Sequence, residues 1–406
     1  MEMVQDIRIE DFTYPLPEER IAKYPLACRD DSKLLLYTDE TLREPREEKF
    51  TSIAEHIPSN ALMVFNNTKV VPARLFFRKE TGAVIEIFCL KPVLPTDYEQ
   101  CFAQREKCRW MTIVGNAKRW KTGKLKLYAD SGIDLQAEIV ERGETFIVEF
   151  TWKGGESFSK VMEKCGNIPI PPYLKRETEA IDLERYQTYY ALNEGSVAAP
   201  TAGLHFTQKE LDAIDAKGIT RANVCLHVGA GTFLPVKSDT IGGHTMHREP
   251  FVVEKSFLEL LSRRSTDPIV SVGTTSTRTL ESLYYLGVQC IEKGGFDTVS
   301  QWEPYRSEGY DYTLKEAIDA LVACLDARGE DKLTAETRII IVPGYRYRVI
   351  DYLVTNFHQP QSTLLLLIGA LVGENWKKIY KFALENNFRF LSYGDSSLLQ
   401  RQTDKK

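Results

Sequence analysis

The chain has 406 residues, of which 43% are hydrophobic and 27% are charged, and its formal net charge is −5. This length predicts two or three domains rather than one, and the composition excludes an intrinsically disordered chain. The negative net charge excludes a protein that binds nucleic acid through overall basicity, whereas a local basic patch would still suffice to bind RNA.

The first part of the chain predicts an α/β domain that is interrupted by a β domain. Apolar runs at residues 34–37 and 61–65 end in polar or turn residues, as buried strands do. Short β-rich runs without a helical period then follow at residues 84–90, 111–114, 125–128, 138–141 and 145–152. This spacing predicts a small antiparallel β-barrel domain, inserted as residues 72–152.

Strands and helices alternate again after residue 153. Residues 208–217 have a helical pattern that Gly218 is well placed to end, and a strand is expected at residues 223–228. The β-branched runs at residues 268–272 and 338–342 are typical of buried strands. We therefore expect a discontinuous α/β catalytic domain, formed by residues 1–71 and 153–406.

Residues 301–332 form a charged, tyrosine-rich segment within that domain, and residues 314–327 have helical spacing. A surface hairpin or lid is one interpretation. We favour the simpler one, an extra surface helix on the outside of the α/β domain.

Nothing in the sequence indicates export or membrane insertion. The eight cysteines are scattered without a CxxC pair, and the chain starts with a mixed polar and acidic stretch rather than a signal sequence. The longest apolar run, residues 364–372, is too short to cross a bilayer and predicts a buried helix. We expect a cytoplasmic protein without a disulfide framework.

Four of the six histidines fall between residues 205 and 247. Histidine transfers protons near neutral pH and also binds metals. The spacings are unlike those of known zinc motifs, and Cys225 is the one nearby thiol, so we expect proton transfer and no metal. His205 and His227 each lie in a small-residue turn that also carries threonine, where glycine lets a ligand approach the backbone.

Three further segments are candidates for binding. Gly-Thr-Thr-Ser-Thr-Arg at residues 273–278 follows a predicted strand and opens a helix, which suits an anion, although simple helix capping would explain it too. Residues 66–74 end a strand with Lys69 and Arg74. Arg346 and Arg348 alternate with two tyrosines, which suits either single-stranded RNA or a solvated edge strand.

Together these segments resemble one family in order and extent, over about residues 10–397. The motifs lie at residues 21–26, 29–30, 66–75, 170–173, 184–188, 196–207, 226–236, 246–247, 272–282, 343–345, 355–358 and 392–395. They are similar to those of the S-adenosylmethionine:tRNA ribosyltransferase-isomerases of queuosine biosynthesis. That family's fold, an α/β domain with an inserted β-barrel, agrees with the one predicted above from strand spacing.

The resemblance implies a transferase that is also an isomerase. It implies that the ribosyl group of S-adenosylmethionine moves to 7-aminomethyl-7-deazaguanine at the tRNA wobble position, giving epoxyqueuosine, adenine and methionine. The implied partners are the anticodon loop and S-adenosylmethionine as co-substrate, with no further cofactor and no membrane, and we expect a monomer.

The resemblance also suggests which residues form the site. Proton transfer falls to His205, His227 and His247. Thr201, Thr232, Thr274 and Thr275 are expected to anchor the donor, and Arg278 to hold its carboxylate. The other residues expected to bind substrate are Lys69, Arg74, Gly203, Gly229, Gly231, Tyr345, Asn356, His358, Tyr393 and Asp395.

The chain departs from the family pattern in a few places. Residues 301–332 are longer than expected, residues 114–118 lack the usual proline, and Arg248-Glu249-Pro250 replaces a Ser-Glu-aromatic sequence. These differences leave three alternatives open: a relative with another RNA or base substrate, a methyltransferase, or a non-catalytic RNA-binding protein.

Overall fold

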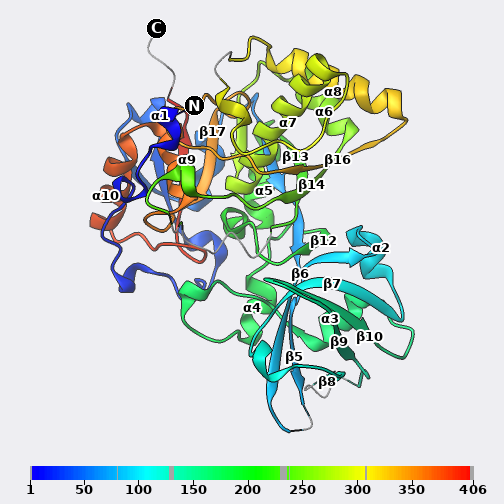
Figure 1. Ribbon diagram of the computed structural model, residues 1–406. Helices are drawn as coiled ribbons and strands as arrows, with labels where there is room; N and C mark the ends of the chain where they lie inside the picture. The colour runs from blue at the N-terminus through cyan, green and yellow to red at the C-terminus, as the bar shows by residue number, and fades with distance from the viewer. Residues whose placement is uncertain are drawn as a thin grey trace.

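The computed structural model describes residues 2–79, 81–127, 132–228, 236, 238–306 and 309–402. A large mixed sheet with helices packed around it forms the upper part of Figure 1, and a β-barrel forms the lower part. In these ranges no helix combines the length and apolar character needed to cross a membrane.

The large sheet has the strand order β16-β14-β13-β3-β15-β17-β18-β1-β2. Its strands are β1 (Lys33–Tyr37), β2 (Arg46–Lys49), β3 (Leu62–Asn66), β13 (Thr220–Leu226), β14 (Glu249–Glu254), β15 (Ile269–Val272), β16 (Lys332–Thr337), β17 (Tyr352–Asn356) and β18 (Ser396–Gln400). The central strands β13, β3, β15 and β17 run parallel. Their carboxyl ends therefore meet at one edge of the sheet, where open α/β sheets bind ligands.

Both faces of this sheet are covered, which explains its continuous apolar strands. Leu62 and Val64 of β3 pack into one core, while Met63 and Phe65 pack into a second core on the opposite face. The covering helices are α5 (Gln208–Ala216), α6 (Lys255–Arg263), α7 (Thr274–Lys293), α8 (Leu314–Arg328), α9 (Thr363–Val372) and α10 (Asn375–Glu385). In Figure 1, α6, α7 and α8 lie beside one another at one end of the sheet.

Most of the elements predicted for this domain are confirmed. The runs at 34–37, 61–65, 223–228 and 268–272 form β1, β3, β13 and β15, and the run at 364–372 forms α9. The helix predicted at 208–217 is α5, capped by the side chain of Thr207 and followed by Gly218 at φ +84°.

The strand predicted at residues 338–342 is wrong, because β16 ends at Thr337. The residues that follow are buried, but side chains satisfy some of their N–H groups. Ile339 N donates to Thr337 Oγ1, and Val342 N donates to Tyr305 Oη. The apolar run at residues 338–342 therefore predicted burial correctly but did not predict the secondary structure.

The helical spacing at 314–327 forms α8, which packs against α6 and α7. Its inner face carries Ile318, Leu321 and Leu325, all buried in the core of the sheet domain. The segment thus contributes an extra packed helix rather than a free hairpin or lid.

The barrel closes through six antiparallel strands, as predicted from strand spacing. They are β5 (Arg74–Arg78), β6 (Val84–Leu94), β7 (Lys107–Val114), β10 (Phe146–Thr151), β9 (Gln136–Arg142) and β8 (Leu125–Leu127), with β8 pairing back to β5. Alternate residues of β6 point inward, and Ile85 and Ile87 are fully buried.

Two later elements join this unit. The helix α3 (Phe158–Cys165) buries Phe158 and Met162 in the barrel core, and β11 (Gly166–Asn167) pairs with β5. A Cβ at Gly166 would lie 1.9 Å from the carbonyl oxygen of Pro72, so only glycine allows this approach. The boundary predicted at residue 152 leaves out these elements, because sequence spacing does not show which core a helix packs into.

The chain crosses between the sheet domain and the barrel twice, and the two crossings lie side by side. Strand β4 (Thr68–Val70) leads into the barrel, and β12 (Asn193–Ser196) lies on the return path. The two strands pair in parallel as a small separate sheet.

Candidate functional site

A small cavity, here called the strand-end cavity, lies at the carboxyl edge of the central parallel strands. Its volume is about 110 Å³. It is bounded by the end of β17, the start of α7, the short helix η8 (Thr201–His205) and Val228 after β13. Its polar lining includes Thr201, Thr274, Thr275, Asn356 and His358, all expected from the sequence to bind substrate.

Asn356 lines this cavity and carries an unsatisfied acceptor. Its Nδ2 donates to Nε2 of His205 at 3.1 Å and to the carbonyl oxygen of Asp395 at 3.4 Å. Its Oδ1 is buried and has no hydrogen-bond partner among the described residues. A buried carbonyl oxygen without a donor costs about 1–3 kcal/mol, so a ligand hydroxyl or ammonium group that donated to it would recover that cost.

His205 holds Asn356 from behind rather than lining the cavity itself. His205 is 4% exposed, and its ring packs against Phe50. The distance from its Nδ1 to Ser32 Oγ is 2.9 Å. Burial, with smaller contributions from Arg29 and Arg389, lowers the pKa of His205 to about 3. The neutral ring accepts at Nε2 and therefore donates from Nδ1 to Ser32, which leaves no ring nitrogen free to exchange protons.

The N-terminus of α7 forms another wall of the cavity. Gly273 adopts φ +90°, and Thr274 and Thr275 follow as the first two helical residues. The N–H groups of a first helical turn have no partner inside the helix and attract anions. This wall therefore suits a carboxylate.

Arg278 does not reach the cavity, contrary to its expected role as a carboxylate anchor. It lies one turn further along α7 and forms a buried ion pair with Glu249 of β14. Burial raises the pKa of Glu249, and the Arg278 charge opposes that shift. The cation is thus held by a protein carboxylate instead of a ligand.

His358 lines the cavity and is also held by the protein. Its Nε2 lies 2.9 Å from Thr355 Oγ1, and its backbone N–H donates to Tyr380 Oη. Burial lowers the pKa of His358 to about 3. His358 is therefore neutral at physiological pH and contributes a polar wall.

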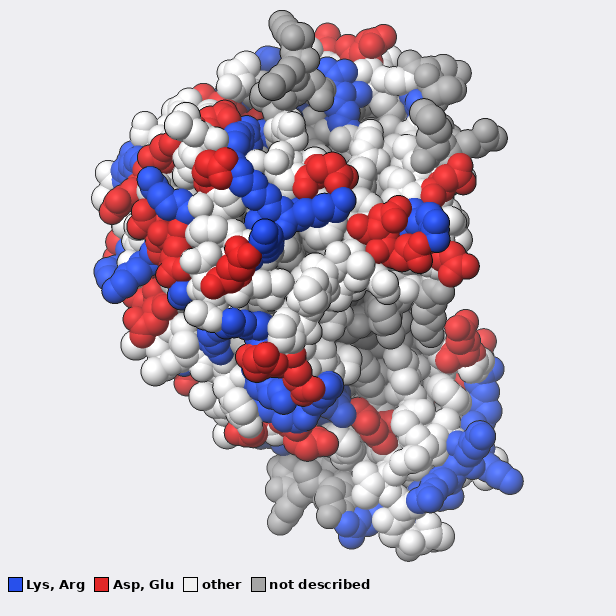
Figure 2. Space-filling view, turned by 90° about the vertical axis from the view of Figure 1, so that its left-hand side faces the viewer, with Lys and Arg blue, Asp and Glu red and all other residues white. Residues whose placement is uncertain are grey.

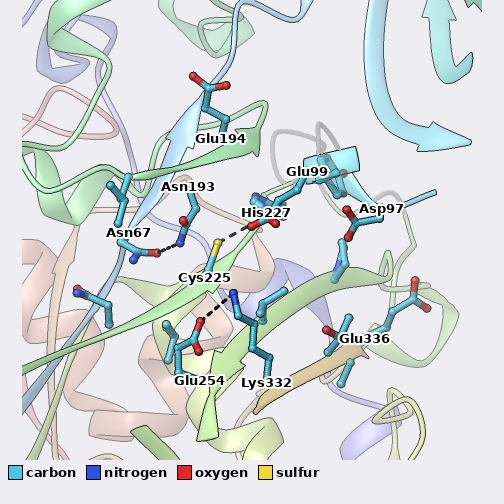
Figure 3. A pocket seen from close by; sticks show the side chains of 18 of the residues that line it. Asn67, Asp97, Glu99, Asn193, Glu194, Cys225, His227, Glu254, Lys332 and Glu336 are labelled. Carbon is cyan, nitrogen blue, oxygen red and sulfur yellow. Dashed lines mark hydrogen bonds and ion pairs between the residues drawn. The ribbon is translucent and has the colours of Figure 1, made fainter. Parts of the chain in front are cut away.

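A second and much larger hollow, the interdomain groove, lies between the barrel and the sheet, with a volume of about 1870 Å³ (Figure 3). Residues of β6, β12, β13, β14 and the barrel helix α2 (Tyr98–Ala103) line it. Acidic and basic side chains both face it, among them Asp97, Glu194 and Lys332.

His227 is the histidine of this groove. Its ring is 8% exposed, lies 4.5 Å from the ring of Tyr98, and contacts Thr68 Oγ1 through Nδ1 at 3.0 Å. Its Nε2 has only a weak partner, the thiol of Cys225 at 3.8 Å. Burial lowers the pKa of His227 to about 4, against a small opposing effect of Asp97. The ring is neutral and keeps one nitrogen available for a proton.

Backbone close to His227 is shaped to fit the ring. Gly195 has φ +149°, and a Cβ there would lie 2.6 Å from two ring atoms of His227. Nearby, Asn193 Nδ2 donates to Asn67 Oδ1 at 3.1 Å, so two amides face the groove together. Burial raises the pKa of the Cys225 thiol to about 11, which leaves it protonated.

The remaining predicted residues lie outside both hollows or pack into the structure. His247 is exposed and lines neither. Gly203 is a packing residue, since a Cβ there would lie 2.0 Å from Tyr190 Oη. Lys69 and Arg74 form ion pairs with Glu194 and Glu86. Gly229, Gly231 and Thr232 lie outside the described residues.

The expectation that Tyr345 binds RNA by stacking conflicts with its position. Tyr345 and Tyr347 are buried, and Tyr345 Oη donates to Glu281 Oε2 at 2.8 Å. Arg346 between them is exposed. The alternation therefore has an inward tyrosine face, and these rings support the fold.

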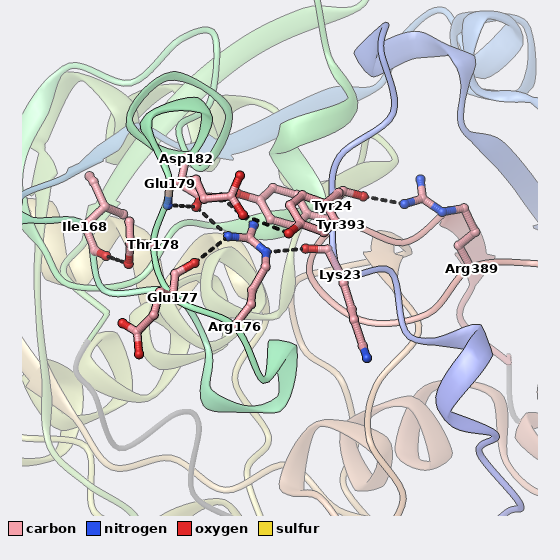
Figure 4. Close-up of polar contacts among 10 residues, drawn as sticks. All are labelled: Lys23, Tyr24, Ile168, Arg176, Glu177, Thr178, Glu179, Asp182, Arg389 and Tyr393. Atoms are coloured by element: carbon pink, nitrogen blue, oxygen red, sulfur yellow. Dashed lines mark hydrogen bonds and ion pairs between the residues drawn. The ribbon is translucent and has the colours of Figure 1, made fainter.

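Tyr393 and Asp395 also have structural partners. Asp395 accepts from the backbone N–H groups of Lys33 and Arg389, at 3.0 and 2.7 Å. Tyr393 Oη donates to Asp182 Oδ1 at 2.7 Å (Figure 4). Both predicted residues thus fix the C-terminal segment beside the cavity.

Asp182 is a central residue that the sequence did not reveal. Its two carboxylate oxygens each accept from Arg176 at 2.7 Å, and the carboxylate also accepts from Glu179 N at 2.8 Å. Arg176 Nε in turn donates to the carbonyl oxygen of Lys23 (Figure 4). This network connects three chain segments that are far apart in sequence, so no local sequence pattern could have predicted it.

Comparison with known proteins gives consistent matches over nearly the whole chain. The family model described as "Queuosine biosynthesis protein" matches residues 9–399. Proteins of Trichlorobacter lovleyi and Treponema denticola, both named S-adenosylmethionine:tRNA ribosyltransferase-isomerase, are each 37% identical, with 96% of this chain and 99% of theirs covered. The crystal structure of an S-adenosylmethionine tRNA ribosyltransferase from Thermotoga maritima is 26% identical with a TM-score of 0.45, covering 96% of this chain and 99% of that one.

Proposed function

This chain belongs to the queuosine biosynthesis family, and we propose that it acts as its relatives are named, as an S-adenosylmethionine:tRNA ribosyltransferase-isomerase. It transfers and isomerises the ribosyl group of S-adenosylmethionine onto 7-aminomethyl-7-deazaguanine at the tRNA wobble position. The products are epoxyqueuosine-tRNA, adenine and methionine. The enzyme works in the cytoplasm as a monomer, with S-adenosylmethionine as co-substrate and no other cofactor.

One observation carries this proposal: consecutive residues line the two hollows. His227 lines the interdomain groove, and Val228 lines the strand-end cavity. Group transfer requires both substrates to be held within bonding distance, which converts a bimolecular step into an intramolecular one. A donor in the cavity and a flipped-out base in the groove would lie on either side of the chain at His227 and Val228.

The strand-end cavity suits the amino-acid end of the donor. The first turn of α7, with Thr274 and Thr275, offers backbone N–H groups to the carboxylate. Asn356 Oδ1 accepts from the ammonium or from a ribose hydroxyl. The cavity is too small for the whole donor, so the ribose and adenine extend past Val228.

The chemistry explains the need for a proton carrier. The sulfonium makes the adjacent 5′ hydrogens acidic, and a base removes one of them. The electron pair that is released opens the ribose and expels adenine, which takes up a proton as it leaves. The aminomethyl group of the tRNA nucleobase then adds to the opened sugar, and ring closure displaces methionine to form the epoxide. We assign proton transfer to His227, whose Nε2 is neutral and weakly bonded.

Turnover with defined tRNA tests the proposal. The protein is incubated with S-adenosylmethionine and tRNA that carries the aminomethyl base, and adenine and methionine are quantified against modified tRNA. We expect all three in equal amounts, and none with tRNA that carries guanine at the wobble position, because guanine lacks the amine. Formation of S-adenosylhomocysteine would instead indicate a methyltransferase, and tRNA binding without any product would indicate a non-catalytic relative.

A further inference from the structure

The end of the barrel that lies away from the interdomain groove carries a cluster of cations that the proposed reaction does not use. This cluster, the basic barrel end, consists of Lys79, Lys118, Arg119, Lys121, Lys124 and Lys126. All except the half-buried Lys79 are exposed. The stretch from Lys118 to Lys126 contains no acidic residue.

Backbone contacts hold this end in place. Lys79 Nζ donates to the carbonyl oxygen of Arg119 at 2.7 Å, and Arg142 donates to the carbonyl oxygens of Trp120 and Lys121. Trp120 is fully buried and anchors the loop in the barrel core. The cations are therefore presented on a fixed surface and not on a free tail.

Carboxylate partners are sparse around these cations. Among the described residues, the one carboxylate within ion-pair distance of the cluster is that of Glu138, 3.9 Å from Lys124. By contrast, every lysine of α10 is paired with a carboxylate: Lys377 with Glu374, Lys378 with Glu44 and Lys381 with Glu385. On the face drawn in Figure 2, Lys and Arg gather with few acidic neighbours at the lower right, in the barrel part of the molecule, while both signs intermingle above.

Unpaired like charges on one fixed surface of an acidic protein indicate a polyanionic partner. Strand β6 connects this surface to the groove, because Val84 pairs with β5 at the basic end and Pro92 lines the groove. Eight residues of strand span about 26 Å. A nucleic-acid strand with phosphates roughly 3.4 Å apart covers that distance in about eight nucleotides.

We propose that the basic barrel end binds the sugar-phosphate backbone of the tRNA stem next to the anticodon loop. This inference rests on the proposed function, which places the wobble base in the groove. The contacts are to phosphates, so they position the tRNA without reading its sequence. The barrel then serves as a second, salt-sensitive point of attachment, separate from the chemistry.

Replacing four exposed lysines with glutamine tests this proposal: Lys118→Gln, Lys121→Gln, Lys124→Gln and Lys126→Gln together. Each phosphate contact contributes about 0.7–0.9 to the slope of log affinity against log salt. We expect the slope for tRNA to fall by about 3 between 50 and 200 mM salt, and KM for tRNA to rise at least tenfold with kcat unchanged. The matched control replaces three lysines of α10, Lys377, Lys378 and Lys381, and should leave slope and KM as in the parent.

A charge-preserving variant separates charge from shape. With the same four lysines replaced by arginine, we expect the parent slope to be retained, since arginine also binds phosphate. An unchanged slope and KM in the glutamine variant, with thermal unfolding as in the parent, would overturn the proposal. The proposed function fails separately: the parent protein would then release no adenine while the glutamine substitutions still lowered the salt slope.

Discussion

The strand-end cavity and the interdomain groove both hold buried, neutral histidines, yet they use them differently. In the cavity region His205 is bonded at both ring nitrogens, to Ser32 and Asn356. In the groove His227 is bonded firmly at Nδ1 alone, and a thiol at 3.8 Å is the partner of Nε2. The pKa of each is lowered by burial, so the pKa does not distinguish them. What separates a positioning histidine from a proton carrier here is whether a ring nitrogen is left without a strong partner.

The origin of the two hollows explains the difference. The cavity is built at one edge of a single sheet, where β15 and β17 end and α7 begins. The groove is assembled from two domains, with Tyr98 from the barrel facing His227 from the sheet. The site between two domains offers the space that a large substrate needs, whereas the strand-end site is small and leaves Asn356 Oδ1 as its unsatisfied acceptor.

Replacing His227 should have the largest effect. His227→Asn keeps a polar group towards Thr68 but cannot transfer a proton, so kcat should fall by about 10²–10⁴-fold at saturating substrates. Adenine release measures it, and circular dichroism confirms folding. His56→Asn, at a histidine that contacts Glu40 away from both hollows, should keep the parent kcat. If His227→Asn retained a third of the parent kcat, the groove histidine would not be the proton carrier.

Replacing Asn356 probes the cavity side of the comparison. Asn356→Ala removes the free Oδ1 acceptor and takes the donor away from His205 Nε2. Losing a ligand hydrogen bond of about 1.5–3 kcal/mol should raise KM for S-adenosylmethionine by about 10–150-fold, with a smaller change in kcat. Initial-rate kinetics at varied donor concentration give both constants. A large fall in kcat at unchanged KM would instead place Asn356 in the chemical step.

Sequence patterns predicted much of the fold, because burial leaves a local trace. The apolar run around Met63 and Val64 marked a strand covered on both faces, and closely spaced β-rich runs marked the barrel. Predictions from sequence patterns were wrong where they depended on what a residue packs against. The alternation around Tyr345 shows two faces, but nothing local states that the tyrosine face is the inner one.

The candidate site was predictable only in part, for the same reason. Clustering in the sequence pointed to His205, His227 and His247; the structure places His227 in the groove, His205 behind Asn356 of the cavity, and His247 outside both hollows. The different partners of His205 and His227, Ser32 and Tyr98, come from segments more than a hundred residues away, so spacing alone could not assign roles. The family resemblance predicted the reaction but not the different roles of His205 and His227.

The pH dependence of stability sharpens the picture of His205 as a neutral, enclosed ring. The unfolded chain binds a proton at this residue below about pH 6.5, while the native state stays neutral down to about pH 3. Its contribution is therefore complete above pH 6.5 and is lost as pH falls, by about 1.4 kcal/mol per unit. In His205→Gln the fall in unfolding free energy between pH 7.0 and 5.5, measured in urea, should be smaller by about 1.3 kcal/mol.

A destabilising change without a titrating group serves as the control for that experiment. Ser362→Ala removes the N-cap of α9, whose hydroxyl bonds to the backbone of Gln359 and Leu365, and should lower the unfolding free energy by about 1 kcal/mol at both pH values. If His205→Gln behaved like Ser362→Ala, with the same loss at each pH, His205 would be charged or exposed in the native state.

The smallest effect is expected from Ser32→Ala, and it tests whether positioning passes through a chain of contacts. Ser32 is 2% exposed and accepts from His205 Nδ1, which fixes the tautomer whose Nε2 faces Asn356. Losing this acceptor should cost about 1 kcal/mol of unfolding free energy and raise KM for S-adenosylmethionine a few-fold, with kcat unchanged. Ser52→Ala, which removes only a bond to the carbonyl oxygen of Lys49, should change neither. Parent-like KM in Ser32→Ala would mean that Asn356 holds its orientation without His205, and the two histidines would then differ less than their contacts indicate.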